Sequence, residues 1–391
     1  MLWHMTTATV ADGPEQAPAP PAAGAPAPDS AEALASEHSN NLPALFAELG
    51  ISLLVTTYQA GKLIVVRNDG GVLNTHFRPF SKPMGLAADG QRFAIGTTQE
   101  LIEYRNVPAV CDKLEPKGKH DACYIPRFGW VTGDIDIHEM AFDARGALWF
   151  INTRFSTLCT LDGAHSFVPR WRPSFVSSLA PEDRCHLNGL GLLNGAPRYV
   201  TALGTADTPQ GWREHKKDGG VLIDLETGRL LSRGLSMPHS PRWHAGQLWL
   251  LESGKGTLAK VDYATGAVET VATLPGFTRG LDFYGPLAFI GLSQVRETAV
   301  FSGIPITEKA VERNCGVWVV NIMTGQLVGV LKFKSGVQEI FAVQVLRGLR
   351  FPEVLEPGHP LIGSSYVLPD AALKDVKYTP PAGGGNAPVK A

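Results

Sequence analysis

The sequence has no long hydrophobic run, no excess of charge of either sign and no local catalytic signature. Because the sequence has no run of about 18 consecutive apolar residues, we expect no membrane-spanning helix and no membrane partner. The 35 basic and 37 acidic residues leave a net charge of −2, so we expect no nucleic-acid partner held by a basic surface. The motifs GxSxG, HExxH and GxGxxG are all missing. The sequence therefore gives no support for an α/β-hydrolase, a zincin-type protease or a dinucleotide-binding unit.

Cysteine is also scarce, with five residues and no CxxC pair, namely Cys111, Cys123, Cys159, Cys185 and Cys315. An odd number without paired spacing disfavours both a zinc ribbon and a disulfide framework. The first residues lack the basic start and the apolar stretch of a secretory signal. Together these two features predict a cytoplasmic protein.

The two ends of the chain differ in composition from the middle. Residues 11–30 contain seven Ala and six Pro, and such a segment cannot bury enough apolar surface to offset the entropy of ordering it. We therefore expect a disordered tail over residues 1–40 and a folded body over 41–353. Residues 354–391 are expected to form a C-terminal extension that ends in a flexible, Pro- and Gly-rich tail.

Gly and Pro are abundant, at 42 and 29 residues, which indicates many turns. Short apolar runs rich in β-branched and aromatic residues recur between these turns and read as strands. The runs belong to a longer repeat of a short apolar strand, a turn, a second strand, a small residue and a third strand. Three units also contain a tight Asp/Asn-x-x-x-Gly turn before the next strand, at Asp224, Asp262 and Asn321.

The repeat can be aligned on one position in each unit: Met84, Glu139, Asn188, Pro241, Arg279 and Glu339. The first and last of these are five repeats apart, which gives a mean spacing of 51 residues. Four-stranded propeller blades need about 40–50 residues. The sequence thus predicts an all-β fold with a single β-propeller, six-bladed by this count, with seven blades as the alternative. Residues 51–80 and the last unit are expected to share the closing blade.

Five long stretches of the body carry a resemblance to a known family. They read GDIDIHEMAF, LWFINTRFSTLCTLD, HSFVPRWRPSFVSSLAPEDRCHLNGL, MPHSPRWHAGQLW and LPGFTRGLDF. Over about residues 45–353 the chain resembles a family of bacterial proteins that is propeller-like and has no assigned function. The blade rhythm is more distantly similar to six-bladed propellers of the gluconolactonase and strictosidine-synthase type. In the calcium-dependent lactonases of that group, a Glu and Asn or Asp residues hold the metal, which by resemblance would fall on Glu139 and Asn188. Arg279 and Pro241 stand where further oxygen ligands are expected.

Polar residues gather at the aligned position, where the innermost strands of a propeller begin. These strands surround the central channel, so residues about 50 apart in sequence converge there. The set is His138, Glu139, His186, Asn188, His239, Arg279 and Glu339. Since side chains alternate along a strand, His138 and Glu139 can both face the channel only if the strand bends.

Three histidines and a carboxylate suit a divalent metal, so we predict a metal cofactor held by His138, His186, Asn188 and His239. Glu139, Arg279 and Glu339 are the candidate catalytic residues: two acid/base groups and an anion-binding guanidinium. The predicted function is a pocket for a small polar or anionic molecule at the channel entrance, with metal-assisted hydrolysis as one reaction it could serve. Two alternatives remain open: the pocket binds a ligand without a metal, or these residues only close the channel by hydrogen bonds. The alternative function is a non-enzymatic scaffold or ligand-binding module with a protein partner.

Two neighbouring features could contribute to this site. Asp134 and Asp136 precede His138 at alternate positions and could orient an imidazole, although a solvated or turn-capping role fits as well. Residues 205–217 form a polar insertion with Trp212, Arg213 and His215. This insertion either covers the channel as a lid or forms a plain exposed loop.

Overall fold

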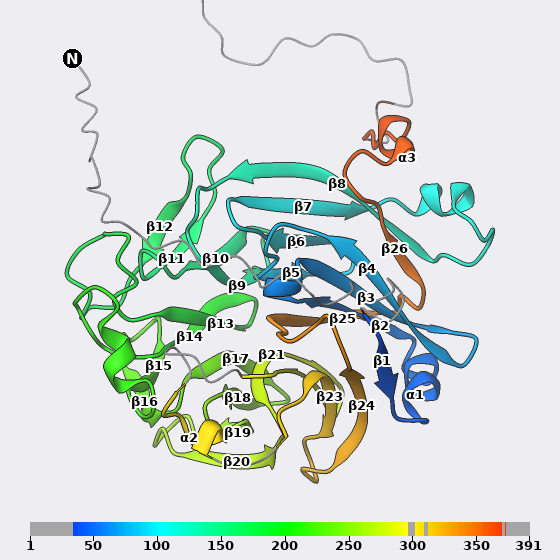
Figure 1. Ribbon diagram of the computed structural model, residues 1–391. Helices are drawn as coiled ribbons and strands as arrows, with labels where there is room; N and C mark the ends of the chain where they lie inside the picture. The colour runs from blue at the N-terminus through cyan, green and yellow to red at the C-terminus, as the bar shows by residue number, and fades with distance from the viewer. Residues whose placement is uncertain (1–33, 296–301, 309–311, 370–371, 373–391) are drawn as a thin grey trace, which may run out of the picture.

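The computed structural model of the protein describes residues 34–295, 302–308, 312–369 and 372. Its strands form six sheets set around a common centre (Figure 1). Each sheet has four strands that follow one another from the centre outwards, and two sheets carry one extra strand at the outer edge. The prediction of a single six-bladed β-propeller is confirmed, and the described part of the chain holds no seventh blade.

The first three blades follow the chain without interruption. Blade 1 contains β5 (Leu86–Ala88), β6 (Arg92–Gly96), β7 (Glu100–Asn106) and β8 (Ala122–Val131). Blade 2 contains β9 (Ile137–Phe142), β10 (Leu148–Asn152), β11 (Thr157–Thr160) and β12 (Val168–Trp171). Blade 3 contains β13 (Leu187–Leu193), β14 (Ala196–Ala202), β15 (Gly220–Asp224) and β16 (Leu230–Leu235).

The next two blades are built in the same way. Blade 4 contains β17 (Pro238–His244), β18 (Gln247–Glu252), β19 (Thr257–Val261) and β20 (Val268–Thr273). Blade 5 contains β21 (Phe277–Tyr284), β22 (Leu287–Ser293), β23 (Cys315–Asn321) and β24 (Leu327–Phe333). The helical segments are short: α1 (Leu42–Leu49), α2 (Pro305–Glu308), α3 (Pro360–Gly363), and the 3-10 turns η1 (Tyr58–Ala60), η2 (Pro108–Lys113) and η3 (Gly211–His215).

The sixth blade closes the ring with strands from both ends of the chain. Its outer strands are β2 (Ile51–Thr56), β3 (Lys62–Asp69) and β4 (Val72–Pro79), and its innermost strand is β25 (Ala342–Arg347). β25 pairs antiparallel with β2 from Thr56↔Ala342 to Ile51↔Arg347. The expectation that residues 51–80 share a blade with the last unit is therefore confirmed.

Burial explains why the middle strands are apolar throughout and the outer ones are not. Every residue of β22 is buried, because this strand lies between two strands of its own blade and between two neighbouring blades. In the outer strand β20, five of the six residues are partly or fully exposed, Ala272 alone is buried, and the strand carries Thr and Glu. The tight turns were also as expected: the Asp262 carboxylate accepts a hydrogen bond from the Thr265 N–H at 2.8 Å, and Gly266 has a φ of +75°.

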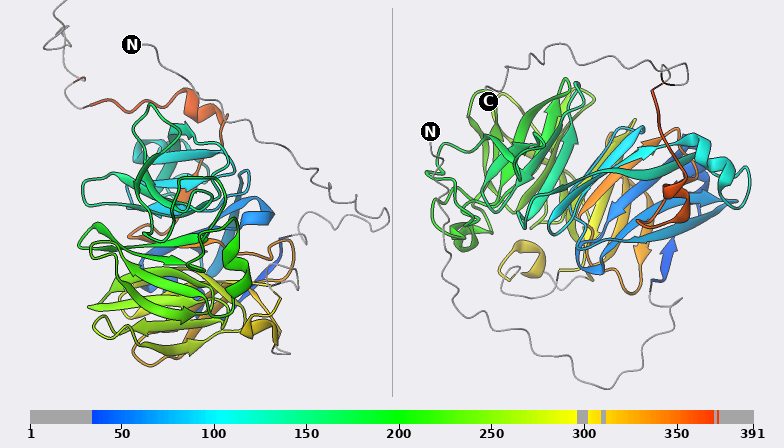
Figure 2. Two further views of the ribbon diagram at one scale, coloured as in Figure 1. Left: turned by 90° about the vertical axis from the view of Figure 1, so that its left-hand side faces the viewer. Right: turned by 90° about the horizontal axis from the view of Figure 1, so that it is seen from above.

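Two short strands extend the ring at its outer edge. β1 (Ser36–His38) pairs with β24, and it lies inside the range 1–40 that composition assigns to a tail. β26 (Pro352–Val354) runs parallel to β8, and α3 follows it against Val110, Cys111 and Ile125. The two views of Figure 2 show this C-terminal segment on the outside of the stacked strands. Residues 1–33 and 373–391 of the two expected tails lie outside the described residues.

β26 is held in place by a buried carboxylate, Glu353. Its oxygens lie 2.7 Å from the Arg78 guanidinium, 3.0 Å from His76 Nε2 and 3.5 Å from the Arg67 guanidinium. The three basic side chains belong to β3 and β4, so Glu353 joins the closing blade to the outer edge of blade 1. Within the described ranges, no helix has the length and apolar character needed to span a bilayer.

Candidate functional site

The chain bends sharply just before three consecutive inner strands. Asp136 before β9, His186 before β13 and Met237 at the start of blade 4 have φ values of 48°, 50° and 47°. Non-glycine residues seldom adopt this left-handed conformation. The bends repeat at intervals of 50 and 51 residues, so they are part of the blade architecture. They turn three side chains of different chemistry toward the same end of the channel.

A β-bulge follows each bend and sets which side chains face the channel. In β9, His138 and Glu139 lie opposite the single residue Ile151, and in β21 Arg279 and Gly280 lie opposite Gly291. The pairing of β13 and β17 also shifts, next to Asn188 and after His239. Bulges re-aim side chains that a regular strand would alternate. They provide the bend that the adjacent residues His138 and Glu139 require.

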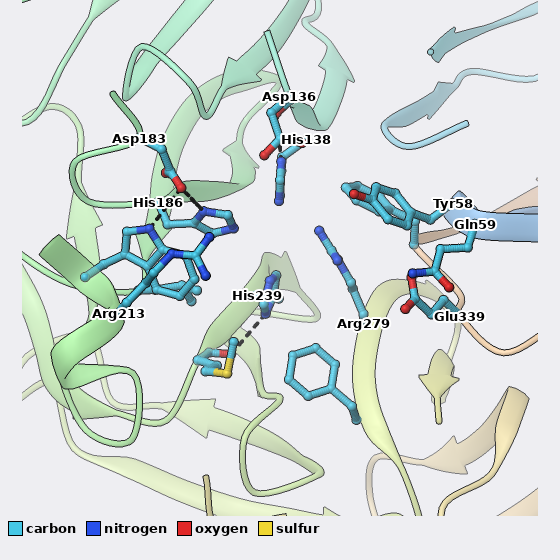
Figure 3. A pocket seen from close by; sticks show the side chains of 15 residues that line it. Tyr58, Gln59, Asp136, His138, Asp183, His186, Arg213, His239, Arg279 and Glu339 are labelled. Carbon is cyan, nitrogen blue, oxygen red and sulfur yellow. Dashed lines mark hydrogen bonds and ion pairs between the residues drawn. The ribbon is translucent and has the colours of Figure 1, made fainter. Parts of the chain in front are cut away.

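The bends and bulges surround a pocket of about 430 Å³ at the centre of the ring, the hub pocket (Figure 3). His138, His186, His239, Arg279 and Glu339 all line it, so five of the seven predicted site residues converge there. The remaining lining residues are Tyr58, Gln59, Asp136, Asp183, Leu203, Trp212, Arg213, Met237, Phe277 and Phe341. A cavity of this volume is within the usual range for small-molecule sites.

The hydrogen-bond network assigns the tautomer of two of the three histidines. His138 Nδ1 lies 2.9 Å from the Asp136 carbonyl oxygen, and His239 Nδ1 lies 3.0 Å from the Met237 carbonyl oxygen. A carbonyl can only accept, so each Nδ1 carries the proton and each neutral ring has its lone pair on Nε2. In Figure 3 the rings of His138, His186 and His239 approach one space from different sides. The pocket therefore presents proton-accepting nitrogens.

Burial keeps two of these rings neutral. It lowers the pKa of His138 well below its ordinary value, and the charge of Arg279 and the nearby His186 add to this effect. The pKa of His239 is lowered for the same reasons, with burial first and Arg279 second. Protonating either ring would place a second positive charge beside Arg279 in a poorly solvated site.

Arg279 is the cation at the centre of the pocket. Its guanidinium carbon lies 3.6 Å from the centre of the Phe341 ring, a cation–π contact. Among the described residues it has no hydrogen-bond or ion-pair partner for its N–H groups. Burial lowers the pKa of Arg279, and the negative charge of Glu339 opposes this effect only in part. The pocket thus holds a positive charge that the surrounding protein does not fully compensate.

His186 has a different setting, because a carboxylate holds its ring. His186 Nδ1 lies 2.9 Å from Asp183 Oδ2, and the same oxygen accepts a hydrogen bond from Trp212 Nε1 at 2.9 Å. The Trp212 ring also packs on the His186 ring, with the centroids 4.4 Å apart. Trp212 lies on η3, within the insertion 205–217. That insertion therefore contributes Trp212 and Arg213 to the pocket wall, and Trp212 helps to fix the His186–Asp183 pair.

Glu139 and Asn188 lie below the pocket, beside a small cavity of about 20 Å³. The Glu139 carboxylate forms an ion pair with Arg242 and accepts the Leu190 N–H at 3.1 Å. Asn188 Oδ1 accepts the Thr201 hydroxyl at 2.6 Å. Protein donors thus already occupy these oxygens, and the calcium site implied by the lactonase resemblance does not fit. Glu139 and Asn188 therefore do not line the larger pocket with the other five predicted residues.

The metal prediction can be compared with the geometry. Across residues 34–295, 302–308 and 312–369, no three His, Cys, Asp or Glu side chains are arranged to hold a metal ion. The three imidazoles converge, but Arg279 lies beside them. The divalent metal therefore stays a prediction, which we take up as the second candidate below.

Three of the residues that line the pocket, Asp183, Tyr58 and Phe341, were not predicted from the sequence. Asp183 stands three residues before His186, and an Asp-x-x-His spacing next to an inner strand was the one local signal for it. Asp136, in contrast, orients His138 through its backbone carbonyl, while Asp134 pairs with Arg154 at 2.8 Å. Tyr58 stacks on Phe341 at 5.9 Å across the closing blade. No repeat alignment could have found Tyr58, since its segment precedes the first aligned unit.

Fold and pocket together define the class: a six-bladed β-propeller with a ligand-sized, polar pocket at one end of its central channel. The chain belongs to the family described as a domain of unknown function, DUF4915, whose model matches residues 40–355. The resemblance to a propeller-like family without assigned function is thereby confirmed. No curated protein matches the chain.

Solved structures of other proteins are similar to this chain at low sequence identity. A chain of the nidogen/laminin complex matches with a TM-score of 0.50 at 10% identity, over 76% of this chain and 99% of that one. A protein of unknown function from Bacteroides caccae matches with a TM-score of 0.48 at 10% identity, over 76% and 99% of the two chains. Virginiamycin B lyase from Staphylococcus aureus gives 0.37 at 10% identity, over 70% and 74%. The first of these matches supports the propeller fold, and an identity of 10% says nothing of function.

Proposed function

We propose that the hub pocket binds a small anionic molecule through Arg279 and performs acid–base chemistry on it through His186. The observation that carries this proposal is the Arg279 guanidinium, which lines the pocket without a hydrogen-bonding partner among the described side chains. A planar guanidinium matches a carboxylate or a phosphate with two parallel hydrogen bonds. An anion would supply the charge that burial leaves uncompensated.

The histidines determine which other groups the ligand presents. With Nδ1 protonated, His138 and His239 offer only a lone pair at Nε2. Such an atom accepts hydrogen bonds from hydroxyl or amino groups. The best-fitting ligand is therefore a small anion with further hydrogen-bond donors, and not a plain hydrocarbon acid.

His186 is the candidate for moving a proton. Asp183 fixes Nδ1 and would stabilise the imidazolium that forms when Nε2 accepts a proton from the ligand. Trp212 holds the same carboxylate oxygen and so fixes the orientation of the pair. Glu339 lines the pocket near Arg279 and is the candidate for the opposite proton transfer.

Calorimetric titration of the full chain with acetate, lactate and phosphate tests anion binding. We expect Arg279→Gln to weaken binding at least tenfold, whereas Arg233→Gln, which changes an exposed arginine outside this pocket, leaves it unchanged. Equal affinity of the two variants would refute the proposal.

The same titrations, repeated in buffers of different ionisation enthalpy, test the role of His186. A bound anion favours the charged imidazolium over the neutral ring, so a proton-accepting His186 predicts proton uptake on binding. His186→Gln should abolish most of this uptake while the anion still binds. Binding without proton uptake would refute the acid–base function. The protein would then be a ligand-binding module, which is the non-enzymatic alternative.

A divalent metal is the second candidate, favoured by one observation. All three imidazoles have Nδ1 anchored by an acceptor, the arrangement that orients metal-ligating histidines. Binding would require the rings to move closer than they are now. Titration with Zn²⁺ or Mn²⁺ should show one site in the wild type and none in His239→Gln. A wild type that binds neither ion excludes this candidate.

We also propose the cytoplasm as the compartment. All five cysteines are described, and each is buried and unpaired.

Burial raises the pKa of the Cys185 thiol to about 12, so this residue beside His186 is a packed side chain and not a nucleophile.

A further inference from the structure

A second arginine faces the pocket from the side opposite to Arg279. Arg213 lies on η3, next to Trp212, and lines the hub pocket. Figure 3 shows Arg213 and Arg279 on two sides of the space that the three imidazoles approach. The Arg213 guanidinium carbon lies 4.9 Å from the centre of the Trp212 ring. No other described group forms a hydrogen bond or ion pair with this guanidinium.

Neighbouring arginines show that unpaired guanidiniums are not the rule here. Arg154 pairs with Asp134 at 2.8 Å, and Arg184 pairs with Asp207 at 2.7 Å and with Glu182 at 2.8 Å. Arg242 pairs with Glu139. Each of these three has a protein carboxylate, whereas the two that line the pocket have aromatic faces only. An aromatic face fixes a guanidinium while leaving its N–H groups available.

Among the described residues, no acid of the pocket forms an ion pair with Arg213. Asp183 is held by His186 and Trp212. Asp136 and Glu339 also line the pocket, and within the described ranges neither forms an ion pair with Arg213. Arg213 also lines an outer cavity of about 560 Å³, which shares Asp136 and Asp183 with the hub pocket. The pocket therefore has one cation at its inner wall and one at its mouth.

We propose that the ligand of this pocket is a dianion, with one anionic group on Arg279 and the second on Arg213. This inference rests on the proposed function, since it assumes that Arg279 holds an anion. The chemical class is a small dicarboxylate or a phosphorylated carboxylate whose middle part carries donors for the imidazole nitrogens. Arg213 is then a specificity-determining residue, because it contacts the group that distinguishes a dianion from a monoanion.

The test compares each dicarboxylate with its own monomethyl ester, which removes one charge and little else. Hydroxymalonate, malate and 3-hydroxyglutarate cover a range of spans, and each has a hydroxyl donor between its carboxylates for the imidazole nitrogens. The full chain is titrated with each acid and each half ester. We expect at least one dicarboxylate to bind tenfold or more tightly than its half ester. Arg213→Gln should reduce this ratio to about one, and Arg279→Gln should weaken the acid and the half ester alike. Arg233→Gln is the matched control, and thermal unfolding checks that each variant folds.

The outcomes separate the two proposals. If acids and half esters bind equally well and Arg279→Gln weakens both, the dianion is refuted while the anion pocket stands. If the preference for the dicarboxylate survives in Arg213→Gln, Arg213 is not the second contact and the inference fails. If neither an acid nor a half ester binds and the small anions of the first test also fail, the proposed function falls, and this inference with it.

Discussion

Glu353 provides the most direct test of how the ring is held together. Its side chain is 9% exposed, and it lies between Arg78 and His76 of β4 and Arg67 of β3. Replacing Glu353 with Gln keeps the shape and removes the charge that these groups share. Breaking a buried ion pair from one side costs about 3–5 kcal/mol, because the remaining charge stays buried. Since Gln can still form one hydrogen bond, we expect a loss near the lower limit, about 3 kcal/mol.

The assay is equilibrium unfolding in urea, followed by tryptophan fluorescence. The matched control is Glu356→Gln, because Glu356 pairs with the same Arg78 at 3.3 Å but is 45% exposed. An exposed pair contributes about 0–1 kcal/mol. If Glu353→Gln is no less stable than Glu356→Gln, the cluster does not stabilise the closure and the reasoning is wrong.

The same residue predicts a pH dependence. Burial by itself would raise the pKa of Glu353, but His76, Arg78 and the Val354 N–H outweigh it and hold the pKa well below its ordinary value. The unfolded chain then binds the proton more readily, so the stabilisation is complete above about pH 4.3 and is lost as the pH falls below it. Glu353→Gln should lack this part of the acid sensitivity.

Three further substitutions test the hub. Gly85→Ala would place a Cβ 2.0 Å from the His138 carbonyl oxygen, so it should lower the free energy of unfolding in urea by about 1–3 kcal/mol. The control Gly129→Ala, whose Cβ would meet nothing within 4 Å, should not lower it by this amount. Equal effects would contradict the close packing of blades 1 and 2. Asp183→Asn should move the His186 proton from Nδ1 to Nε2, visible in imidazole nitrogen NMR shifts, and unchanged shifts would exclude the assigned orientation. Arg242→Met should leave the Glu139 charge without its partner and lower the free energy of unfolding by about 3 kcal/mol or more. An unchanged free energy of unfolding in the same assay would show that the ion pair contributes nothing.

The spacing of 51 residues was enough to predict the ring and much of the pocket. It placed His138, His186, His239, Arg279 and Glu339 at one end of the channel, because inner strands of successive blades begin at the same level. It could not separate these residues from Glu139 and Asn188. That separation depends on bulges of a single residue, which leave no trace in a pattern of apolar and polar positions.

The polar partners were harder to predict than the ring. Asp183 reaches His186 only because both residues have positive φ values, which neither side chain favours. Trp212 reads as part of a polar loop, yet it is buried against His186. Both positions follow from tertiary packing, so a single sequence carries little information about them.

The closing blade has a consequence for how the protein is made. β2 leaves the ribosome well before its inner partner β25, which lies 286 residues later in the chain. At about 5–20 residues per second, β2 waits roughly 15–60 s with one edge unpaired. The pocket waits as well, since Tyr58 comes from the early part and Phe341 immediately precedes β25. A ligand that recognises the finished pocket would therefore bind chains that contain β25 and would not bind chains released before β25 is made.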